Sequence, residues 1–172
     1  MTQLSEYLSN QSGDAAPVQH DGPYINCNDL FKIYKRADLE VVALRGLDLT
    51  VEPGELIAII GASGSGKSTL LNILAGLDRP SAGQVMVGSR DLLDVSDNDL
   101  VMYRRSEVGF VWQATARNLV PYLTVADNIE LPMALTGQPA KARRAWSSEL
   151  LESLGIADKA KRLPYELSGG EQ

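Results

Sequence analysis

A glycine-rich turn between an apolar run and an amphipathic segment constrains this chain more than any other stretch. Residues 56–60, Leu-Ile-Ala-Ile-Ile, have the length and composition of a strand buried on both faces. The turn follows, and its six residues are Gly61, Ala62, Ser63, Gly64, Ser65 and Gly66. A helix is expected to begin at Lys67, Ser68 and Thr69, because the apolar residues after them recur at helical spacing: Leu70, Ile73, Leu74 and Leu77. This order of elements predicts an α/β fold.

The turn fits the pattern G-x-x-x-x-G-K-[ST] in the context that a phosphate-binding loop requires. Small residues allow backbone N–H groups to surround a phosphate, and glycine adopts dihedral angles that other residues avoid. The first turn of the following helix adds unpaired N–H donors and the positive end of a dipole. Lys67 is therefore expected on the β- and γ-phosphates of a nucleotide, and the Ser68 hydroxyl on Mg²⁺.

Two other interpretations of the turn are weaker. A flexible Gly/Ser linker would not be flanked by a five-residue apolar run and an amphipathic helix. The dinucleotide pattern G-x-G-x-x-G also fails, since its third glycine, counted from Gly64, falls on Thr69.

Composition limits the classes of partner. The chain has 172 residues and a net charge of −6, with a sequence pI of about 4.8, which argues against nucleic acid as the main partner. The single cysteine, Cys27, excludes an internal disulfide and a cysteine zinc cluster. No apolar run approaches the roughly 18 residues of a membrane span, and the N-terminus lacks a signal-peptide pattern. We expect a cytosolic protein whose membrane role, if any, comes through a partner.

The remaining segments predict a mixed architecture. Residues 1–23 are polar and are expected to form a disordered tail. Strands are predicted at 24–34, 41–51, 84–87 and 108–112, the last ending on Gln113. Ser96 with Asp99, and Thr124 with Asp127, are typical of helix N-caps.

A proline and an amphipathic stripe mark the helices that follow. Pro132 is expected to kink or stop the helix that begins near Thr124. A further helix is predicted at 139–154, with one apolar side formed by Ala142, Ala145, Trp146, Leu150 and Leu154. Its three basic residues, Lys141, Arg143 and Arg144, are expected to form a solvated face in preference to a nucleic-acid patch.

Two features leave alternatives open on the residues alone. Tyr34 ends the first predicted strand, and its ring could either stack on a purine base or pack on the sheet. The final residues, Leu-Ser-Gly-Gly-Glu-Gln at 167–172, could open a helix with a second N–H-rich anion site.

Taken together, residues 24–172 resemble the nucleotide-binding subunit of an ABC transporter. The hexapeptide at 167–172 matches the signature of that family, Gln113 matches its Q-loop glutamine, and Tyr34 matches the aromatic residue that stacks on adenine. The segments 72–83, 108–113 and 118–133 are similar to the lipoprotein-releasing and macrolide-exporting branch of the family.

The resemblance implies a fold that is divided into subdomains. It implies a P-loop NTPase core with an N-terminal antiparallel β subdomain and an inserted α-helical subdomain, and with the C-terminal core strands absent from this chain. The β subdomain and P-loop core would occupy 24–113, the helical subdomain 114–167, and the start of the signature helix 168–172. Without the later strands, the strand at 56–60 would lack partners, so we expect the chain alone to be poorly stable and prone to aggregate.

The resemblance also implies a function. ATP and Mg²⁺ would lie between two such subunits arranged head to tail, on a transmembrane permease at the inner face of the cell membrane. Lys67 and Gln113 are the expected catalytic residues, and Ser68 and Gln113 the expected metal ligands. Nucleotide contacts are expected from Tyr34, from the loop and the first helical turn, and across the dimer from the signature: Gly61, Ala62, Ser63, Gly64, Ser65, Gly66, Lys67, Ser68, Thr69, Ser168, Gly169, Gly170 and Glu171.

Some parts of the family's hydrolytic set are expected beyond Gln172. These are the glutamate that activates water and the switch histidine, and His20 precedes the loop and cannot be that histidine. We therefore expect the parent to be an ATPase and the 172-residue chain to be inactive alone. Residues 129–133 are expected either at the edge of the permease docking surface or in the helical core. The competing interpretations are a nucleotide-binding module that does not hydrolyse, and a DNA-repair or ribosome-associated relative.

Overall fold

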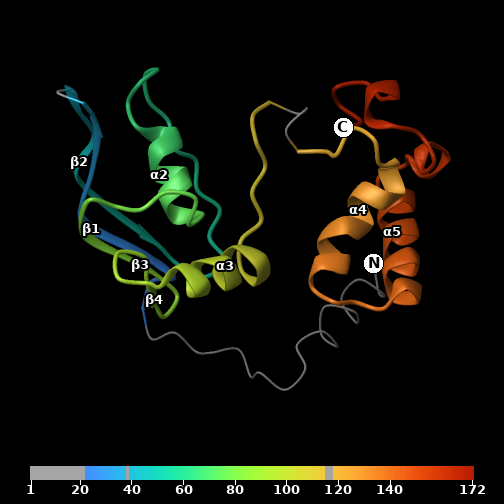
Figure 1. Cartoon of the computed structure of the whole chain (residues 1–172), viewed down its shortest axis with the longest axis horizontal. Helices are drawn as coiled ribbons and strands as arrows, with labels where there is room; N and C mark the ends of the chain where they lie inside the picture. Colours follow the sequence, from blue (N-terminus) through green and yellow to red (C-terminus); the bar gives the residue numbers. More distant parts are fainter. Residues whose placement is uncertain (1–21, 38, 115–117) are drawn as a thin grey trace. The chain divides into compact units, whose positions relative to one another are not determined.

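The computed structural model describes residues 22–37, 39–114 and 118–172, which belong to two compact units, Met1–Leu100 and Val101–Gln172 (Figure 1). The predicted tail, apart from its last two residues, and His20 lie outside the described residues. The predicted α/β class is confirmed, with a sheet in the first unit and helices in both. The division between the units lies within α3, Asp97–Ser106, whereas a boundary after residue 113 remains a prediction.

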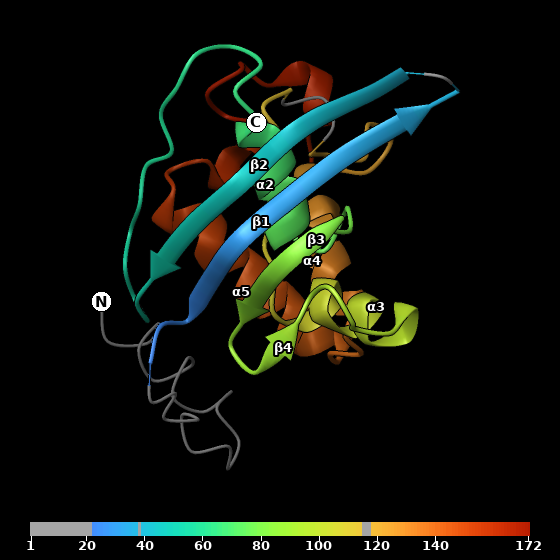
Figure 2. The ribbon, with the colours of Figure 1, turned by 90° about the vertical axis from the view of Figure 1, so that its left-hand side faces the viewer.

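The first unit is built on a four-stranded antiparallel sheet with the order β2-β1-β3-β4 (Figure 2). Its strands are β1 (Ile25–Arg36), β2 (Leu39–Val51), β3 (Ala82–Val87) and β4 (Arg90–Asp91). Ile25 pairs with Val51 on one side and with Val87 on the other, which places β1 at the centre. The strands predicted at 24–34, 41–51 and 84–87 are confirmed within a few residues, as is the antiparallel β subdomain.

An irregularity in β1 sets which of its side chains enter the core. Asp29 has a φ of 48°, and its N–H donates to Asp48 Oδ1 at 2.8 Å. The register with β2 shifts between Cys27 and Leu30, and both residues are buried although they lie three positions apart. An extra residue at a β-bulge changes the alternation of faces in this way. Beyond the bulge, Leu30, Lys32 and Tyr34 follow at intervals of two.

One face of the sheet carries α2, Lys67–Leu74, as both views show (Figures 1 and 2). Leu70 and Ile73 are buried, and Leu44 of β2 is buried with them in the core of this unit. The predicted helix start at Lys67 is confirmed. Leu77, which was expected on the apolar side, follows the end of the helix and is 44% exposed.

Two strand predictions are wrong for this structure. Residues 56–60 and 108–112 have no strand assignment, and Leu56, Ile60 and Val111 are 98%, 92% and 83% exposed. Apolar composition favours a strand, but a strand forms only where a neighbour accepts and donates its backbone hydrogen bonds. Within the described residues, neither segment has a partner strand in the sheet, and both are irregular.

The second unit is helical. It contains α4 (Val125–Leu135), α5 (Ala140–Ser153) and two short 3-10 turns, η2 (Ala157–Lys159) and η3 (Pro164–Glu166). Its core consists of Val125, Leu151 and Leu167, with Ile129 and Ile156 among the side chains packed on it. Both predicted N-caps are confirmed. The Thr124 hydroxyl accepts from the Asp127 N–H at 3.1 Å, and the Ser96 hydroxyl accepts from the Asp99 N–H at 3.2 Å.

Three local expectations for these helices need correction. Pro132 does not stop α4, which continues to Leu135, and the alternative of a kink at Pro132 remains a prediction. The buried positions of α5 are Ser147 and Leu151, whereas Leu154 is 69% exposed. Arg143 is also not a solvated residue, because its Nε lies 3.5 Å from Glu130 Oε2 and its side chain is only 23% exposed. The α4–α5 contact therefore uses an ion pair where the sequence indicated a free basic face.

None of the helices in the described part of the chain combines the length and the apolar character needed to cross a bilayer.

Candidate nucleotide-binding site

The glycine-rich turn leads directly into the N-terminus of α2. Gly66 is the N-cap residue with a φ of 90°, Gly64 has a φ of 79°, and both values lie in the left-handed region that favours glycine. No side chain caps the helix. The N–H groups of its first turn therefore keep the capacity to bind an anion.

The Lys67 ammonium lies over this turn. Its Nζ donates to the carbonyl oxygens of Gly61 and Ala62 at 2.9 and 2.6 Å, and to Ser65 Oγ at 3.3 Å. Residues 61–65 are exposed, as is Ser68. A cation held beside exposed small residues and a free helix N-terminus is a combination that suits a polyphosphate.

Space around the glycines differs from one position to the next. A Cβ at Gly66 would lie 2.6 Å from the carbonyl oxygen of Ala43 and 2.7 Å from Leu44 Cδ2, so α2 approaches β2 there at a distance only glycine allows. A Cβ at Gly64 would meet nothing within 4 Å. Gly66 thus has a packing role and Gly64 only a conformational one.

Tyr34, which pairs with Val41 in the part of β1 beyond the register shifts, is close to the same helix. The residue is 40% exposed, and its hydroxyl donates to Asp78 Oδ2 at 2.7 Å. Burial and the hydrogen bond to Asp78 raise the pKa of Tyr34, and a hydrogen bond with the Thr69 side chain opposes that increase. Tyr34 and the phosphate-binding turn therefore belong to one neighbourhood within the first unit.

Lys32 and Asp78 were not singled out from the sequence. Lys32 Nζ donates to Asp78 Oδ1 at 2.5 Å and to the carbonyl of Arg79 at 2.7 Å, and it lies 4.8 Å from the centroid of the Tyr34 ring. Burial opposes ionisation of Asp78, but hydrogen bonds from Lys32 and Tyr34 outweigh it and hold the pKa of Asp78 below its usual value. The available signal was the spacing of Lys32 and Tyr34, which places both on one face of a strand.

The predicted Q-loop and signature residues lie in the second unit. Gln113 is exposed in a bend, and Ser168, Gly169 and Gly170 are exposed in a turn. The Glu171 carboxylate accepts from the Ser168 N–H at 2.8 Å. Hydrogen bonds from Ser168 lower the pKa of Glu171, so its charge is held at the turn.

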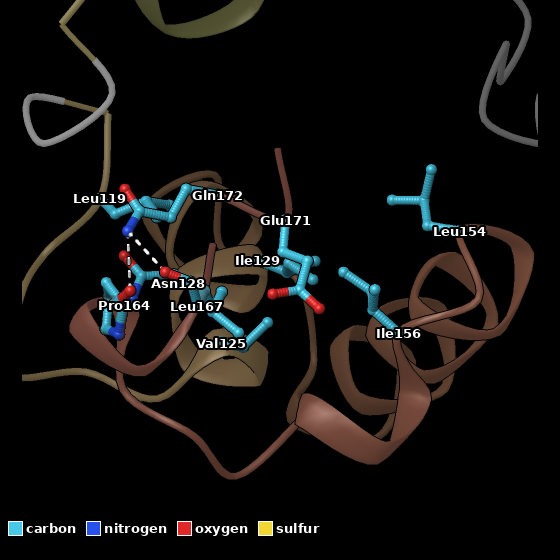
Figure 3. Close-up of a pocket in the computed structure, with 10 residues that line it drawn as sticks. All are labelled: Leu119, Val125, Asn128, Ile129, Leu154, Ile156, Pro164, Leu167, Glu171 and Gln172. Carbon is cyan, nitrogen blue, oxygen red and sulfur yellow. Dashed lines mark hydrogen bonds between the residues drawn. The ribbon is translucent and has the colours of Figure 1, made fainter. Parts of the chain in front are cut away.

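An apolar pocket of about 170 Å³ lies beneath the signature turn (Figure 3). Val125, Ile129 and Leu167 line it, together with the aliphatic side chains of Leu154 and Ile156. At its edge, Gln172 Nε2 donates to the carbonyl oxygens of Pro164 and Leu167 at 2.9 and 3.3 Å. These bonds fasten the last residue to η3, while the residues that precede it stay accessible.

Metal binding would depend on few protein ligands. The described residues contain no group of three or more His, Cys, Asp or Glu side chains arranged to hold an ion. Mg²⁺ characteristically keeps water and binds nucleotide phosphates with only one or two protein oxygens. The exposed Ser68 hydroxyl beside the turn fits that mode of binding.

Comparisons with known proteins agree on one family. A family model described as ABC transporter matches residues 44–172. The chain is 45% identical over 151 residues to a macrolide export ATP-binding/permease protein MacB of Rhodopseudomonas palustris, covering 88% of this chain and 23% of that protein. It is 46% identical over 144 residues to an uncharacterized ABC transporter ATP-binding protein of Thermotoga maritima. That match covers 84% of this chain and 61% of the Thermotoga protein.

A solved structure gives the same result. The dimeric ATP-binding cassette MJ0796, bound to ADP and Pi, superposes with a TM-score of 0.76 at 35% identity, and the match covers 86% of this chain and 64% of that one. The present chain therefore spans about a quarter of the macrolide exporter and less than two thirds of the solved cassette.

Proposed function

Because the chain belongs to the ABC transporter family, we propose that it is the ATP-binding part of a membrane export or extraction complex. The observation that carries the proposal is the geometry around Lys67. Its ammonium lies over the carbonyls of Gly61 and Ala62, beside a helix N-terminus without a side-chain cap. That arrangement offers a polyphosphate one cation and several N–H donors at one place.

Each residue of the turn has a role in the proposal. The backbone N–H groups of Ser63 to Thr69 would hold the phosphates, with Lys67 on the β- and γ-phosphates. The Ser68 hydroxyl would bind Mg²⁺, with Gln113 completing the metal and water environment. Bound Mg²⁺ supplies charge neutralisation for phosphoryl transfer. Tyr34 would stack on the adenine base, a role that its exposed ring and its position beside Thr69 support.

The signature turn would act on a second subunit. Ser168, Gly169 and Gly170 are exposed, and they would cap the γ-phosphate bound to the turn of a partner chain arranged head to tail, with Glu171 among the other nucleotide contacts. The dimeric form of the related cassette supports this part of the proposal. Closure of such a dimer would follow from its greater affinity for ATP when closed.

The wider assignment rests on the relatives. The macrolide and pyoverdine export proteins that resemble this chain carry ATP-binding and permease functions in their names. We infer a transmembrane permease as the partner and a position on the inner face of the cell membrane. A full-length member of this family would hydrolyse ATP, as the related cassette bound to ADP and Pi suggests.

Nucleotide binding by the Lys67→Ala variant tests the proposal. Binding of Mg·ATP to the whole chain, measured by calorimetry, should be lost in this variant because the main phosphate cation is removed. Lys141→Ala provides the control, since Lys141 is an exposed cation on α5. Unchanged ATP affinity in Lys67→Ala would refute the assignment of the site.

A further inference from the structure

The residues around Tyr34 hold its ring at two places. Its hydroxyl donates to Asp78 Oδ2 at 2.7 Å, and the Lys32 ammonium lies 4.8 Å from the ring centroid, over one of its faces. Tyr34 as a whole residue nevertheless stays 40% exposed. An aromatic side chain with one edge bonded and one face covered by a cation presents its remaining face in a defined direction.

Asp78 and Lys32, which together form a clamp on the Tyr34 ring, are themselves held in place by further hydrogen bonds. Asp78 Oδ1 accepts from Lys32 and from the Arg79 N–H, at 2.5 and 2.8 Å. The side chains of Lys32 and Asp78 are 11% and 26% exposed. Ser81 fixes the same segment along β1, because its N–H donates to the carbonyl of Phe31 at 2.8 Å and its hydroxyl accepts from the Ile33 N–H at 3.0 Å.

We propose that Asp78 and Lys32 are positioning residues, which hold the Tyr34 ring so that its free face receives the purine base of the nucleotide. The inference rests on the proposed function, and it adds residues that contact Tyr34 rather than the nucleotide. A ring held in one orientation loses little side-chain freedom when a base stacks on it, so the binding free energy of the base is retained. Lys32 also polarises the ring through its cation–π contact.

The proposal separates recognition of the base from recognition of the phosphates. Asp78 and Lys32 should influence ATP but not inorganic tripolyphosphate, which has no base and depends on the turn at Lys67 alone. Immobilising one side chain upon binding costs about 0.5–1.5 kcal/mol, and a ring that is already held avoids this cost, which corresponds to roughly a two- to twelvefold change in affinity. Loss of the clamp should therefore weaken ATP binding about three- to tenfold and leave tripolyphosphate binding unchanged.

The experiment measures both ligands by calorimetry on the whole chain with Mg²⁺. The variants are Asp78→Ala, Tyr34→Phe and their combination. Tyr34→Phe keeps the stacking ring and removes its hydroxyl, with the bonds to Asp78 and to the Thr69 side chain, so it should weaken ATP binding to a similar degree. The ATP affinity of the double variant should fall by less than the product of the two single-variant factors, because both changes break the hydrogen bond between Tyr34 and Asp78. Asp97→Ala is the matched control, since Asp97 pairs with Arg79 on the surface and is 94% exposed.

Several outcomes would overturn the inference. Wild-type affinity for ATP in Tyr34→Phe would show that the ring needs no anchor. Equal losses for ATP and tripolyphosphate in Asp78→Ala would show that Asp78 supports the turn and not the base. Equal affinities of the wild-type chain for the two ligands would show that the base contributes nothing. By contrast, a wild-type chain that binds neither ligand refutes the proposed function itself, so the two failures are distinguishable.

Discussion

The two glycines of the phosphate-binding turn allow a quantitative test of how the turn is built. Gly64 and Gly66 both have positive φ angles, 79° and 90°, but only Gly66 is in close contact with β2. Alanine at either position carries the strain of a left-handed conformation, about 1–2 kcal/mol. At Gly66 the added Cβ would also lie 2.6 Å from the Ala43 carbonyl oxygen, an atom of the sheet backbone that cannot rotate away.

The expected destabilisation therefore differs between the two variants. Forcing an extra carbon into a packed contact typically costs about 1–3 kcal/mol. Gly66→Ala should lower the free energy of unfolding by about 2–5 kcal/mol, the sum of strain and crowding. Gly64→Ala should lower it by only about 1–2 kcal/mol, since nothing lies within 4 Å of its Cβ.

The chain supplies its own probes for this measurement. Its only cysteine, Cys27, is 2% exposed in the first unit, so the rate of thiol labelling in urea reports opening of that unit. Both tryptophans, Trp112 and Trp146, lie in the second unit, and their fluorescence serves as an internal standard. Equal shifts in the two variants, or a shift of the tryptophan transition as large as that of Cys27, would refute the argument from contact with β2.

Two further predictions concern pH and the helical unit. Burial raises the pKa of the Cys27 thiol to about 11 from 9.0. The folded state therefore holds a proton that the unfolded state loses, and stability should fall by about 2–3 kcal/mol in total as pH rises from 9 to 11. Urea titrations at both pH values should show this loss in wild type and a smaller one in Cys27→Ala. The same decrease in unfolding free energy between pH 9 and pH 11 in both proteins would contradict the argument. In the second unit, the Asn128 side chain donates to the carbonyls of Val120, Leu123 and Thr124 and accepts from the Val120 N–H. Asn128→Ala should lower stability by about 2–4 kcal/mol in tryptophan-monitored unfolding, against little change for Thr136→Ala, because several partly buried backbone groups lose their partner.

Local sequence signals predicted the parts of the fold that depend on local physics. The start of α2 at Lys67, the caps at Ser96 and Thr124, and the two strands that became β1 and β2 all follow from residues within a few positions of one another. Glycine at positions 64 and 66 was expected to permit unusual dihedral angles, and it does. These features require no knowledge of distant contacts.

The features that the sequence did not reveal depend on distant residues. Residues 56–60 have strand composition, but whether they form a strand is decided by a partner elsewhere in the chain. The clamp on Tyr34 joins Lys32 to Asp78 across 46 positions, and no periodicity encodes that pairing. The bulge at Asp29 changes which residues of β1 face the core, through a bond from its N–H to Asp48. The Arg143 side chain is mostly buried because it forms an ion pair with Glu130 of a neighbouring helix.

The position of Lys67 has a consequence for the energetics of ligand exchange. The ammonium already has three oxygen partners of its own, two carbonyls and a hydroxyl. In the proposed function a phosphate would replace these partners, so the free energy gained by the lysine would be a difference between two bonded states. The carbonyl oxygens of Gly61 and Ala62 thus have a donor of their own within the turn, and a bound phosphate would compete with them for the same ammonium.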